Sequence, residues 1–412
     1  MRHPRVRAAS AHIGIDMRQQ PGWSRPGPEA EPAATVVAEL TVTGFRSYAS
    51  LTLALDACPV VLTGANGAGK TNLLEAVSLL TPGRGLRGAD LEDLVHVPRA
   101  GATANADTPT AVSALVACNG EAHRIGTGVE RVPSGWRRPV RIDGTGVRAE
   151  ELAHYVRAVW LTPAMDRLFM EGAGERRRFI DRLAVAHEPR HAAALIAYER
   201  ALRERQRLLK DGVDDAVWLG LLEQAMAAAG VPIAETRLAT ALRLEKAMAE
   251  SDGGAFPRGR LALEGEIEKA LAARGAAGLG DEFRDRLAQG RRRDAEAGRT
   301  LCGPHRSDLE VRHAVTGRPA GLCSTGEQKA LLLALVLAQA RAMAAEAGPP
   351  LLLFDEVAAH LDETRRAALF DEVTALGCQA WLTGTERSLF SPFGARAQYF
   401  SVAEDRLLSV HG

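Results

Sequence analysis

One segment of this 412-residue chain reads Gly64-Ala65-Asn66-Gly67-Ala68-Gly69-Lys70-Thr71. It matches the phosphate-binding P-loop pattern, in which a glycine-rich loop ends in Gly-Lys followed by Ser or Thr. The apolar run 59–63 leads into the loop and predicts a strand, while the spacing of leucine and valine over 72–80 predicts a helix. Because nucleotide-binding loops of this kind join a strand to a helix, the segment predicts an α/β fold.

The residue types in this loop have a chemical reason. Glycines let backbone N–H groups curl around phosphate oxygens, and the N-terminus of the following helix adds partial positive charge. In such loops the lysine, here Lys70, contacts the β- and γ-phosphates, and the hydroxyl of Thr71 binds Mg²⁺. We therefore predict ATP and Mg²⁺ as cofactors, held by the eight loop residues. A glycine-rich turn that matches by chance is the alternative, which the strand and helix around it disfavour.

A second segment carries acidic residues at the end of an apolar strand. Leu351–Phe354 is continuously apolar, as expected of a central parallel strand, and Asp355 and Glu356 follow it. At the carboxyl end of a strand beside the P-loop, Asp355 would hold Mg²⁺ through water. Glu356 would be the general base that polarises the attacking water. A strand followed by a polar turn is the alternative, which the presence of the P-loop disfavours.

A third segment, Ser324–Lys329, precedes an apolar stretch over 330–343 that predicts a buried helix. Ser324 and Glu327 have the spacing of a capping box, a structural role that is expected whatever the function. The functional interpretation is that this helix N-terminus, with its free serine hydroxyl, also binds a γ-phosphate.

Along the chain the three segments follow one another as the P-loop, Ser324–Lys329 and the acidic strand, and in this order they resemble the ABC-type ATPases. In those proteins the signature sequence of one subunit closes on the ATP held by the P-loop of its partner. The resemblance implies an ABC-type P-loop ATPase head that forms an ATP-dependent homodimer, with Ser324 acting in trans. It also identifies Ala358–Asp362 as the D-loop at the dimer interface. Thr325 and Glu327 depart from the signature of transporters.

Three further segments resemble the RecF family of SMC-like ATPases: Gly44–Tyr48, Arg176–Leu183 and Cys302–Leu309. The resemblance covers essentially residues 36–412. It implies a role in recombinational DNA repair, replication-fork maintenance and the SOS response. A protein of this family would bind gapped or duplex DNA as a homodimer with ATP. It would help to load recombinase together with RecR-type mediator proteins, and weak, DNA-stimulated hydrolysis would reset it.

The same resemblance assigns two contact residues and shows two departures. Arg46 and Ser47 are implied to contact the nucleotide, and a turn at a strand end is the less favoured alternative for this fragment. The segment 160–163 offers no lid-loop glutamine, and 383–385 stands where transporters carry a switch histidine. Thr383 would contact phosphate only through its hydroxyl. We therefore hypothesise slow hydrolysis, suited to a timer rather than a motor, while the role of His305 stays open.

Charge and composition exclude other classes of protein. The chain has 51 Lys and Arg against 51 Asp and Glu, so it is no histone-like polycation and would bind DNA through local basic patches. Residues 175–210 and 284–299 have an excess of arginine, which predicts sequence-independent contact with phosphates. A solvated, salt-bridged helix face is the alternative. The five scattered cysteines suit a reducing cytosol, and the longest apolar run, 330–338, is too short for a bilayer, so we expect a cytoplasmic protein with no membrane contact.

Changes in composition also divide the chain. Strand signals occur at 36–42, 51–55, 112–117, 124–129 and 140–142, and helical spacing without strand signals dominates after 172. Glycine and proline, as in Gly230-Val231-Pro232, predict breaks between those helices. The expected parts are a disordered extension (1–34), the lobe of the head with the P-loop (35–171), an inserted helical arm domain (172–300), and the lobe with the signature, acidic strand and D-loop (301–412).

Other ATP-binding classes fit less well. The nucleotide-binding subunit of a transporter places its P-loop and acidic strand closer together than Lys70 and Asp355 are here. A structural-maintenance or double-strand-break head needs a long heptad coiled coil, and no heptad persists in this chain. A metabolic P-loop kinase would not need the signature segment.

Overall fold

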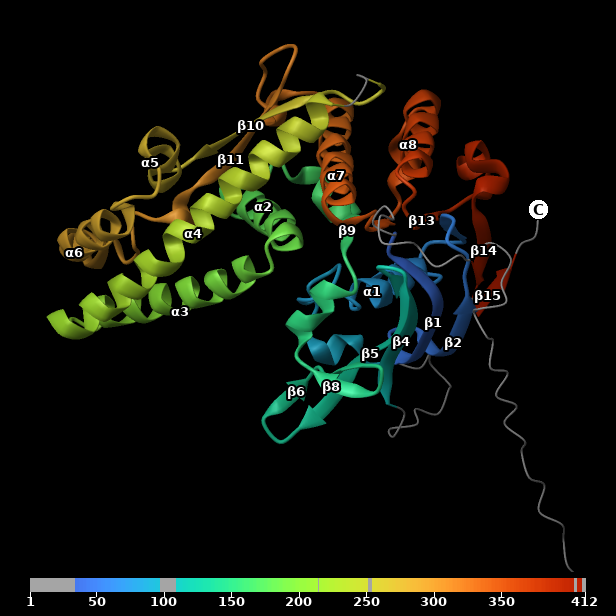
Figure 1. Cartoon of the computed structure of the whole chain (residues 1–412), viewed down its shortest axis with the longest axis horizontal. Coiled ribbons are helices and arrows are strands. Elements are labelled where there is room, and N and C mark those ends of the chain that lie inside the picture. Colours follow the sequence, from blue (N-terminus) through green and yellow to red (C-terminus); the bar gives the residue numbers. More distant parts are fainter. Residues whose placement is uncertain (1–33, 97–108, 214, 251–253, 404–405, 410–412) are drawn as a thin grey trace, which may run out of the picture. The chain divides into compact units, whose positions relative to one another are not determined.

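The structure is a computed structural model that describes residues 34–96, 109–213, 215–250, 254–403 and 406–409. The described residues belong to one compact unit. They form two large sheets, a two-stranded sheet and a set of helices (Figure 1). The predicted N-terminal extension, apart from its last residue, lies outside the described residues.

The sheet that carries the P-loop has six strands in the order β15-β14-β3-β13-β12-β9. They are β3 (Val60–Thr63), β9 (Ala158–Leu161), β12 (Leu351–Phe354), β13 (Ala380–Gly384), β14 (Gln398–Ala403) and β15 (Arg406–Ser409). Only β14 and β15 pair antiparallel. Leu352 and Phe354 join one hydrophobic core, and Leu351 and Leu353 join another. Both faces of β12 are therefore covered, which confirms the predicted buried strand.

A second, antiparallel sheet has the order β2-β1-β4-β5-β7-β8, with β6 paired to β5. Its strands are β1 (Val36–Phe45), β2 (Tyr48–Ala54), β4 (Thr110–Cys118), β5 (Glu121–Val132), β6 (Gly135–Arg137), β7 (Val140–Ile142) and β8 (Thr145–Val147). Helix α1 (Lys70–Ser78) is packed between the two sheets, because Leu73, Leu74 and Val77 share one core with residues of both. This packing fixes the position of the P-loop, which leads directly into α1.

The described part of the segment predicted as a helical arm contains five helices. They are α2 (Ala173–His187), α3 (Arg190–Lys210), α4 (Ala216–Ala249), α5 (Glu266–Arg274) and α6 (Leu279–Ala297). The expectation of no strands was wrong, because β10 (Gly259–Glu264) pairs antiparallel with β11 (Asp308–His313). This pairing crosses the boundary expected at residue 300. Leu263, Leu309 and Val311 belong to the same core as α7 (Thr325–Ala347), so the small sheet is packed against the head.

The predicted break at Gly230-Val231-Pro232 was also wrong, because α4 runs through it for 34 residues. Pro232 lies inside the helix, where it removes one backbone donor. The hydroxyl of Thr236 donates to the carbonyl of Pro232 at 2.9 Å, and the surrounding residues of α4 are buried. Tertiary packing therefore outweighs the local cost of the proline.

Helix α7 is the buried helix predicted from 330–343. Residues 328–340 are all buried, and they fill the core beside β12. By length and composition alone, α4 and α7 could each cross a membrane, which the short run 330–338 did not indicate. In α7, however, 67% of the most apolar 18-residue stretch is buried inside the protein, as in the core helix of a globular fold. Helix α8 (Glu363–Ala375) begins at the N-cap Asp362, and its Leu369, Phe370 and Val373 join the same core as α7.

Candidate nucleotide site

The P-loop has the backbone that close approach to phosphate requires. Gly64 has φ 153° and Gly69, the N-cap of α1, has φ 106°. A Cβ atom on Gly64 would lie 2.2 Å from the carbonyl oxygen of Val402, so the position accepts only glycine. A Cβ atom on Gly69 would lie 2.7 Å from the hydroxyl of Tyr48. Ala65, Asn66 and Gly67 are exposed at the tip of the loop, while Ala68 and Gly69 are buried.

Lys70 is the first residue of α1 and is only 4% exposed. Its Nζ donates to the carbonyl oxygens of Gly64 at 2.7 Å and of Ala65 at 2.9 Å. Burial lowers the pKa of Lys70, and this outweighs the opposing effect of the carboxylates of Glu356 and Asp355. The ammonium group is therefore folded back across the loop, where phosphate oxygens can replace the two carbonyls as acceptors.

The predicted metal ligands lie against each other although they are 284 positions apart. The hydroxyl of Thr71 donates to Asp355 Oδ1 at 2.8 Å, with Oδ2 at 3.1 Å. A hydroxyl and a carboxylate are oxygen donors of the kind that Mg²⁺ binds, usually with several waters retained. The donor set at the junction of α1 and β12 therefore fits Mg²⁺. Among the described residues there is no cluster of three or more His, Cys, Asp or Glu side chains suited to a metal.

Thr383 links the two acidic residues. Its fully buried hydroxyl donates to Asp355 Oδ1 at 2.8 Å and accepts the backbone N–H of Glu356, also at 2.8 Å. Glu356 has φ 53°, a left-handed conformation that costs a residue other than glycine about 1–2 kcal/mol. The hydrogen bond from Glu356 to Thr383 fixes that backbone directly after β12. Thr383 thus holds the acidic pair from the neighbouring strand β13.

Arg46 and Ser47 lie beside the P-loop helix. Arg46 makes two hydrogen bonds of 2.9 Å to the buried carboxylate of Glu75, which also accepts from Arg87 at 3.0 Å. Ser47 accepts from the side-chain amide of Asn72 at 2.9 Å. In this structure both residues are therefore engaged with α1 and its flanking segment, at the edge of the loop.

Ser324 is the N-cap of α7, and the predicted capping box is present. The backbone N–H of Glu327 donates to Ser324 Oγ at 3.3 Å, and the N–H of Ser324 donates to Glu327 Oε2 at 2.8 Å. No hydrogen bond joins Ser324 to the P-loop of the same chain in the described part. Two large apolar side chains near this end of α7 are exposed, Leu322 (68%) and Met170 (62%). The signature segment therefore lies on an open, partly apolar surface.

A pocket of about 690 Å³ begins at the predicted metal ligands. Thr71 and Asp355 line one side, the segment 162–165 another, and α2 a third. Four residues of α2 face the pocket: Glu175, Arg178, Phe179 and Arg182. The sequence interpretation missed α2 as a wall of the site. Its signal was available, because these positions have the i, i+3, i+4, i+7 spacing of one helix face.

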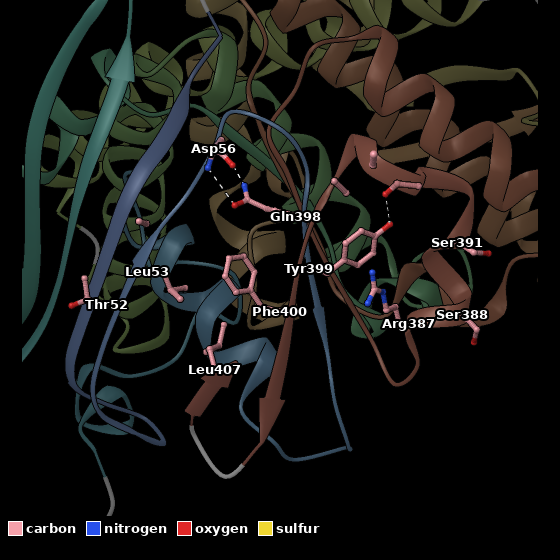
Figure 2. A pocket seen from close by; sticks show the side chains of 14 residues that line it. Thr52, Leu53, Asp56, Arg387, Ser388, Ser391, Gln398, Tyr399, Phe400 and Leu407 are labelled. Carbon is pink, nitrogen blue, oxygen red and sulfur yellow. Dashed lines mark hydrogen bonds between the residues drawn. The ribbon is translucent and has the colours of Figure 1, made fainter. Parts of the chain in front are cut away.

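A different pocket, of about 1020 Å³, lies between β2, β14 and the 3-10 segment Arg387–Arg396 (Figure 2). It contains none of the predicted site residues. Its wall is held by Gln398, which accepts from the backbone N–H of Asp56 at 3.3 Å and donates to the Asp56 carbonyl at 3.0 Å. The Arg387 guanidinium lies 4.6 Å from the ring centre of Tyr399. Of the two pockets, only the smaller one is lined by predicted site residues, Thr71 and Asp355.

About half of the arginines of the predicted basic patches have carboxylate partners. Four salt bridges of α6 are Arg284–Asp281, Arg286–Glu266, Arg291–Glu223 and Arg292–Glu296. Arg205 of α3 is fully buried and binds Glu223 and Asp294. Arg200, Arg203 and Arg293 are exposed and form no salt bridge within the described chain. The salt-bridged alternative thus accounts for much of the arginine excess, and a few cations remain for a partner.

His305 makes polar contacts with α3 and with the segment that follows α6. Its Nδ1 is 2.8 Å from the hydroxyl of Tyr198, and its Nε2 is 3.0 Å from the carbonyl of Thr300. Burial lowers the pKa of His305. The ring therefore joins α3 to the segment after α6, which is a packing role.

Comparison with known proteins agrees with this geometry. The family described as "RecF/RecN/SMC N terminal domain" matches residues 36–401. The DNA replication and repair protein RecF of Caulobacter sp. (strain K31) is 51% identical over 376 residues, which cover 89% of this chain and 96% of that protein. The protein of the same name from Brucella suis biovar 1 (strain 1330) is 46% identical over 387 residues, covering 93% and 98%.

Solved structures show the same fold. The "recombination mediator protein RecF-ATPrS in RecFOR pathway" matches with a TM-score of 0.78 at 21% identity, over 92% of this chain and 100% of that one. The Smc head domain of Pyrococcus furiosus matches with a TM-score of 0.51 at 17% identity, over 91% and 96%. The fold and the P-loop thus define an SMC-like, ABC-type head. The chain belongs to the RecF family of DNA replication and repair proteins.

Proposed function

We propose that this protein is an ATP-dependent DNA-binding protein of recombinational repair and replication-fork maintenance. ATP would bring two copies together on gapped or duplex DNA in the cytoplasm, and slow hydrolysis would release them. With RecR-type mediator proteins, and in the SOS response, it would help to load recombinase. The observation that supports the proposal is the contact of Thr71 with Asp355, because this hydroxyl and carboxylate would hold the Mg²⁺ of a bound nucleotide at the end of β12.

The residues around that contact have distinct roles in the proposal. Lys70 releases the carbonyls of Gly64 and Ala65 and binds the β- and γ-phosphates. Thr71 and Asp355 hold Mg²⁺, which when bound supplies positive charge against the phosphate oxygens. Glu356 orients and polarises the water that attacks the γ-phosphate. Thr383 keeps the two acidic groups in register through its buried hydroxyl.

The surface around Ser324 supports action in trans. Ser324 is exposed at the N-terminus of α7, where backbone N–H groups and the helix dipole favour an anion. Leu322 and Met170 expose apolar area nearby that a second copy would cover. Gln328, one turn further on, is fixed by its amide, which donates to the carbonyl of Cys323 at 2.9 Å. We propose that this surface closes on the P-loop of the partner when ATP is bound.

The decisive experiment is gel filtration of the full chain with a slowly hydrolysed ATP analogue, with ADP and with no nucleotide, repeated with gapped DNA. The analogue is expected to shift the protein from monomer to dimer and to retain DNA. Lys70→Ala is expected to abolish both effects while leaving the folded protein intact. If the Lys70→Ala variant dimerised and retained DNA as the parent does, the ATP switch would be refuted.

A further inference from the structure

The helix α2 presents a set of charged residues to the pocket that starts at Thr71 and Asp355. Three arginines line this pocket: Arg87, Arg178 and Arg182. Arg87 has a carboxylate partner in Glu75, and Arg178 has one in Glu175. Arg182 forms no salt bridge with any described residue. It is therefore the pocket arginine whose charge lacks a protein counter-charge.

The surroundings of Arg182 hold the side chain without neutralising it. Its guanidinium lies 5.4 Å from the ring centre of Trp160 on β9 and 5.4 Å from that of Phe179. One nitrogen donates weakly to the sulfur of Met165 at 3.4 Å. Burial lowers the pKa of Arg182 to about 10, so the group is still charged at neutral pH. Aromatic faces attract a cation, but they compensate only part of the cost of removing it from water.

The carboxylates of the pocket are already engaged. Glu175 binds Arg178, and Glu171 lies 3.6 Å from Arg167. Asp355 accepts hydrogen bonds from the hydroxyls of Thr71 and Thr383. An anion bound beside Thr71 and Asp355 would therefore share the pocket with one guanidinium that has no carboxylate partner, that of Arg182. Arginine binds phosphate oxygens well, because its planar fork donates two parallel hydrogen bonds.

We propose that Arg182 is a ligand for the terminal phosphate of the nucleoside triphosphate whose Mg²⁺ is held at Thr71 and Asp355. The inference rests on the proposed function, since it assigns a further residue to the same site. A nucleoside diphosphate lacks the group that Arg182 binds. Arg182 accordingly makes the site prefer a triphosphate over a diphosphate, and the rings of Trp160 and Phe179 hold the guanidinium in place until the phosphate arrives.

The test measures equilibrium affinities of the full chain for a slowly hydrolysed ATP analogue and for ADP, both with Mg²⁺. Arg182→Met keeps an unbranched apolar side chain beside the rings, although a shorter one, and removes the guanidinium and its charge. Its affinity for the analogue is expected to fall about 10- to 100-fold, as for loss of a charged hydrogen bond, with ADP affinity unchanged. Arg182→Lys, which retains the positive charge, is expected to recover part of the lost affinity. It is also the variant to measure if Arg182→Met does not fold.

The control is Arg207→Met, which removes an exposed arginine of α3 that pairs with Glu204 outside the pocket. Its ratio of analogue to ADP affinity is expected to change less than about threefold. An unchanged ratio in both Arg182 variants would overturn the inference, as would equal losses for the analogue and ADP, which mark a packing role. A variant that loses binding of inorganic phosphate alone, with the ratio intact, would overturn it in favour of a free-anion site.

The outcomes separate this inference from the proposed function. If the parent protein binds neither the analogue nor ADP, the nucleotide site itself is refuted. If the parent binds both and the Arg182 variants keep the parental ratio, the inference about Arg182 fails while the ATP switch stands.

Discussion

The hydroxyl of Thr383 is a small group with a large expected effect. It supports Asp355 on one side and the strained backbone of Glu356 on the other. Thr383→Val keeps the shape and removes both hydrogen bonds, so Glu356 loses its anchor. We expect the single-turnover rate of ATP hydrolysis to fall about tenfold or more, with the affinity for the ATP analogue within about threefold of the parent.

The control for this variant is Thr374→Val, which removes a hydroxyl on α8 that donates to the carbonyl of Phe370 at 2.7 Å. This variant loses a comparable hydrogen bond outside the site, so its rate of ATP hydrolysis is expected to match that of the parent. Equal rates in the parent and Thr383→Val would show that Thr383 does not position the acidic pair.

His305 makes stability depend on pH in a defined direction. Its pKa is lowered by burial, with the nearby charges of Arg306 and Arg177 acting in the same direction. Below about pH 6.5 the unfolded chain therefore binds a proton that the folded chain resists, so the free energy of unfolding falls as the pH decreases. The loss continues until the pH reaches the lower pKa of the folded state.

Urea denaturation at pH 7.5 and pH 5.5 measures this effect. His305→Gln keeps groups that can bond to Tyr198 and Thr300 but cannot titrate. The variant is expected to lose less stability between the two pH values than the parent does. An equal or larger loss in the variant would contradict the assignment to His305.

Single residues of the site differed in how well the sequence predicted them. Lys70, Thr71 and Asp355 were predictable because their motifs require a fixed backbone context, and the structure brings Thr71 and Asp355 together. The phosphate contact of Thr383 stays a prediction, and the sequence did not indicate that its hydroxyl also binds Asp355 and Glu356. Arg182 was not singled out, because its lack of a counter-charge depends on tertiary neighbours such as Trp160.

At the scale of an element, α4 contains two glycines whose replacement by alanine is expected to have opposite effects on stability. A Cβ atom on Gly230 would lie 2.9 Å from Phe283 and 3.2 Å from Tyr198. Gly230→Ala is therefore expected to destabilise the protein by about 1–3 kcal/mol through overpacking. Gly220 has nothing within 4 Å of such an atom, so Gly220→Ala is expected to stabilise it by about 0.5–1 kcal/mol.

Thermal unfolding of the two variants and the parent tests both predictions, because the melting temperature is expected to fall for Gly230→Ala and to rise for Gly220→Ala. A higher melting temperature for Gly230→Ala would contradict the close packing of α3, α4 and α6 around that position. A lower one for Gly220→Ala would show that α4 is not helical there.

Elements with a regular local pattern of burial were predictable from the sequence. Elements that depend on contacts with distant parts of the chain were not. The strands of the antiparallel sheet alternate in burial, so their pattern was legible in the sequence. The pattern over Gly230–Pro232 predicted a break, yet burial of α4 against α3 and α6 keeps it helical. Strand β10 is stabilised by pairing with β11, a partner that no local signal identifies.

At the scale of the whole molecule, zero net charge makes DNA binding a local property. Arg200, Arg203 and Arg293 are exposed cations without a salt bridge in the described chain. Replacing all three with alanine is expected to weaken DNA binding and to reduce the slope of log affinity against log salt by about 2 to 3. Fluorescence anisotropy with duplex DNA over a salt series measures both quantities.

The control is Arg286→Ala, which removes an exposed arginine of α6 that is already paired with Glu266. Its salt slope is expected to stay close to that of the parent, because a paired arginine displaces few counterions from DNA. A triple variant whose slope equals the parent's would show that these three arginines do not contact DNA.

The helix α2 has a second face, away from the nucleotide pocket. There Arg176 binds Asp308, Arg177 donates to the carbonyl of Ser307, and Asp181 accepts from Arg237 of α4. Because one helix carries both sets of contacts, a displacement of α2 at the pocket would also act on Asp308 at the start of β11 and on Arg237 of α4. Helix α2 therefore links the nucleotide pocket mechanically to the helices of the arm.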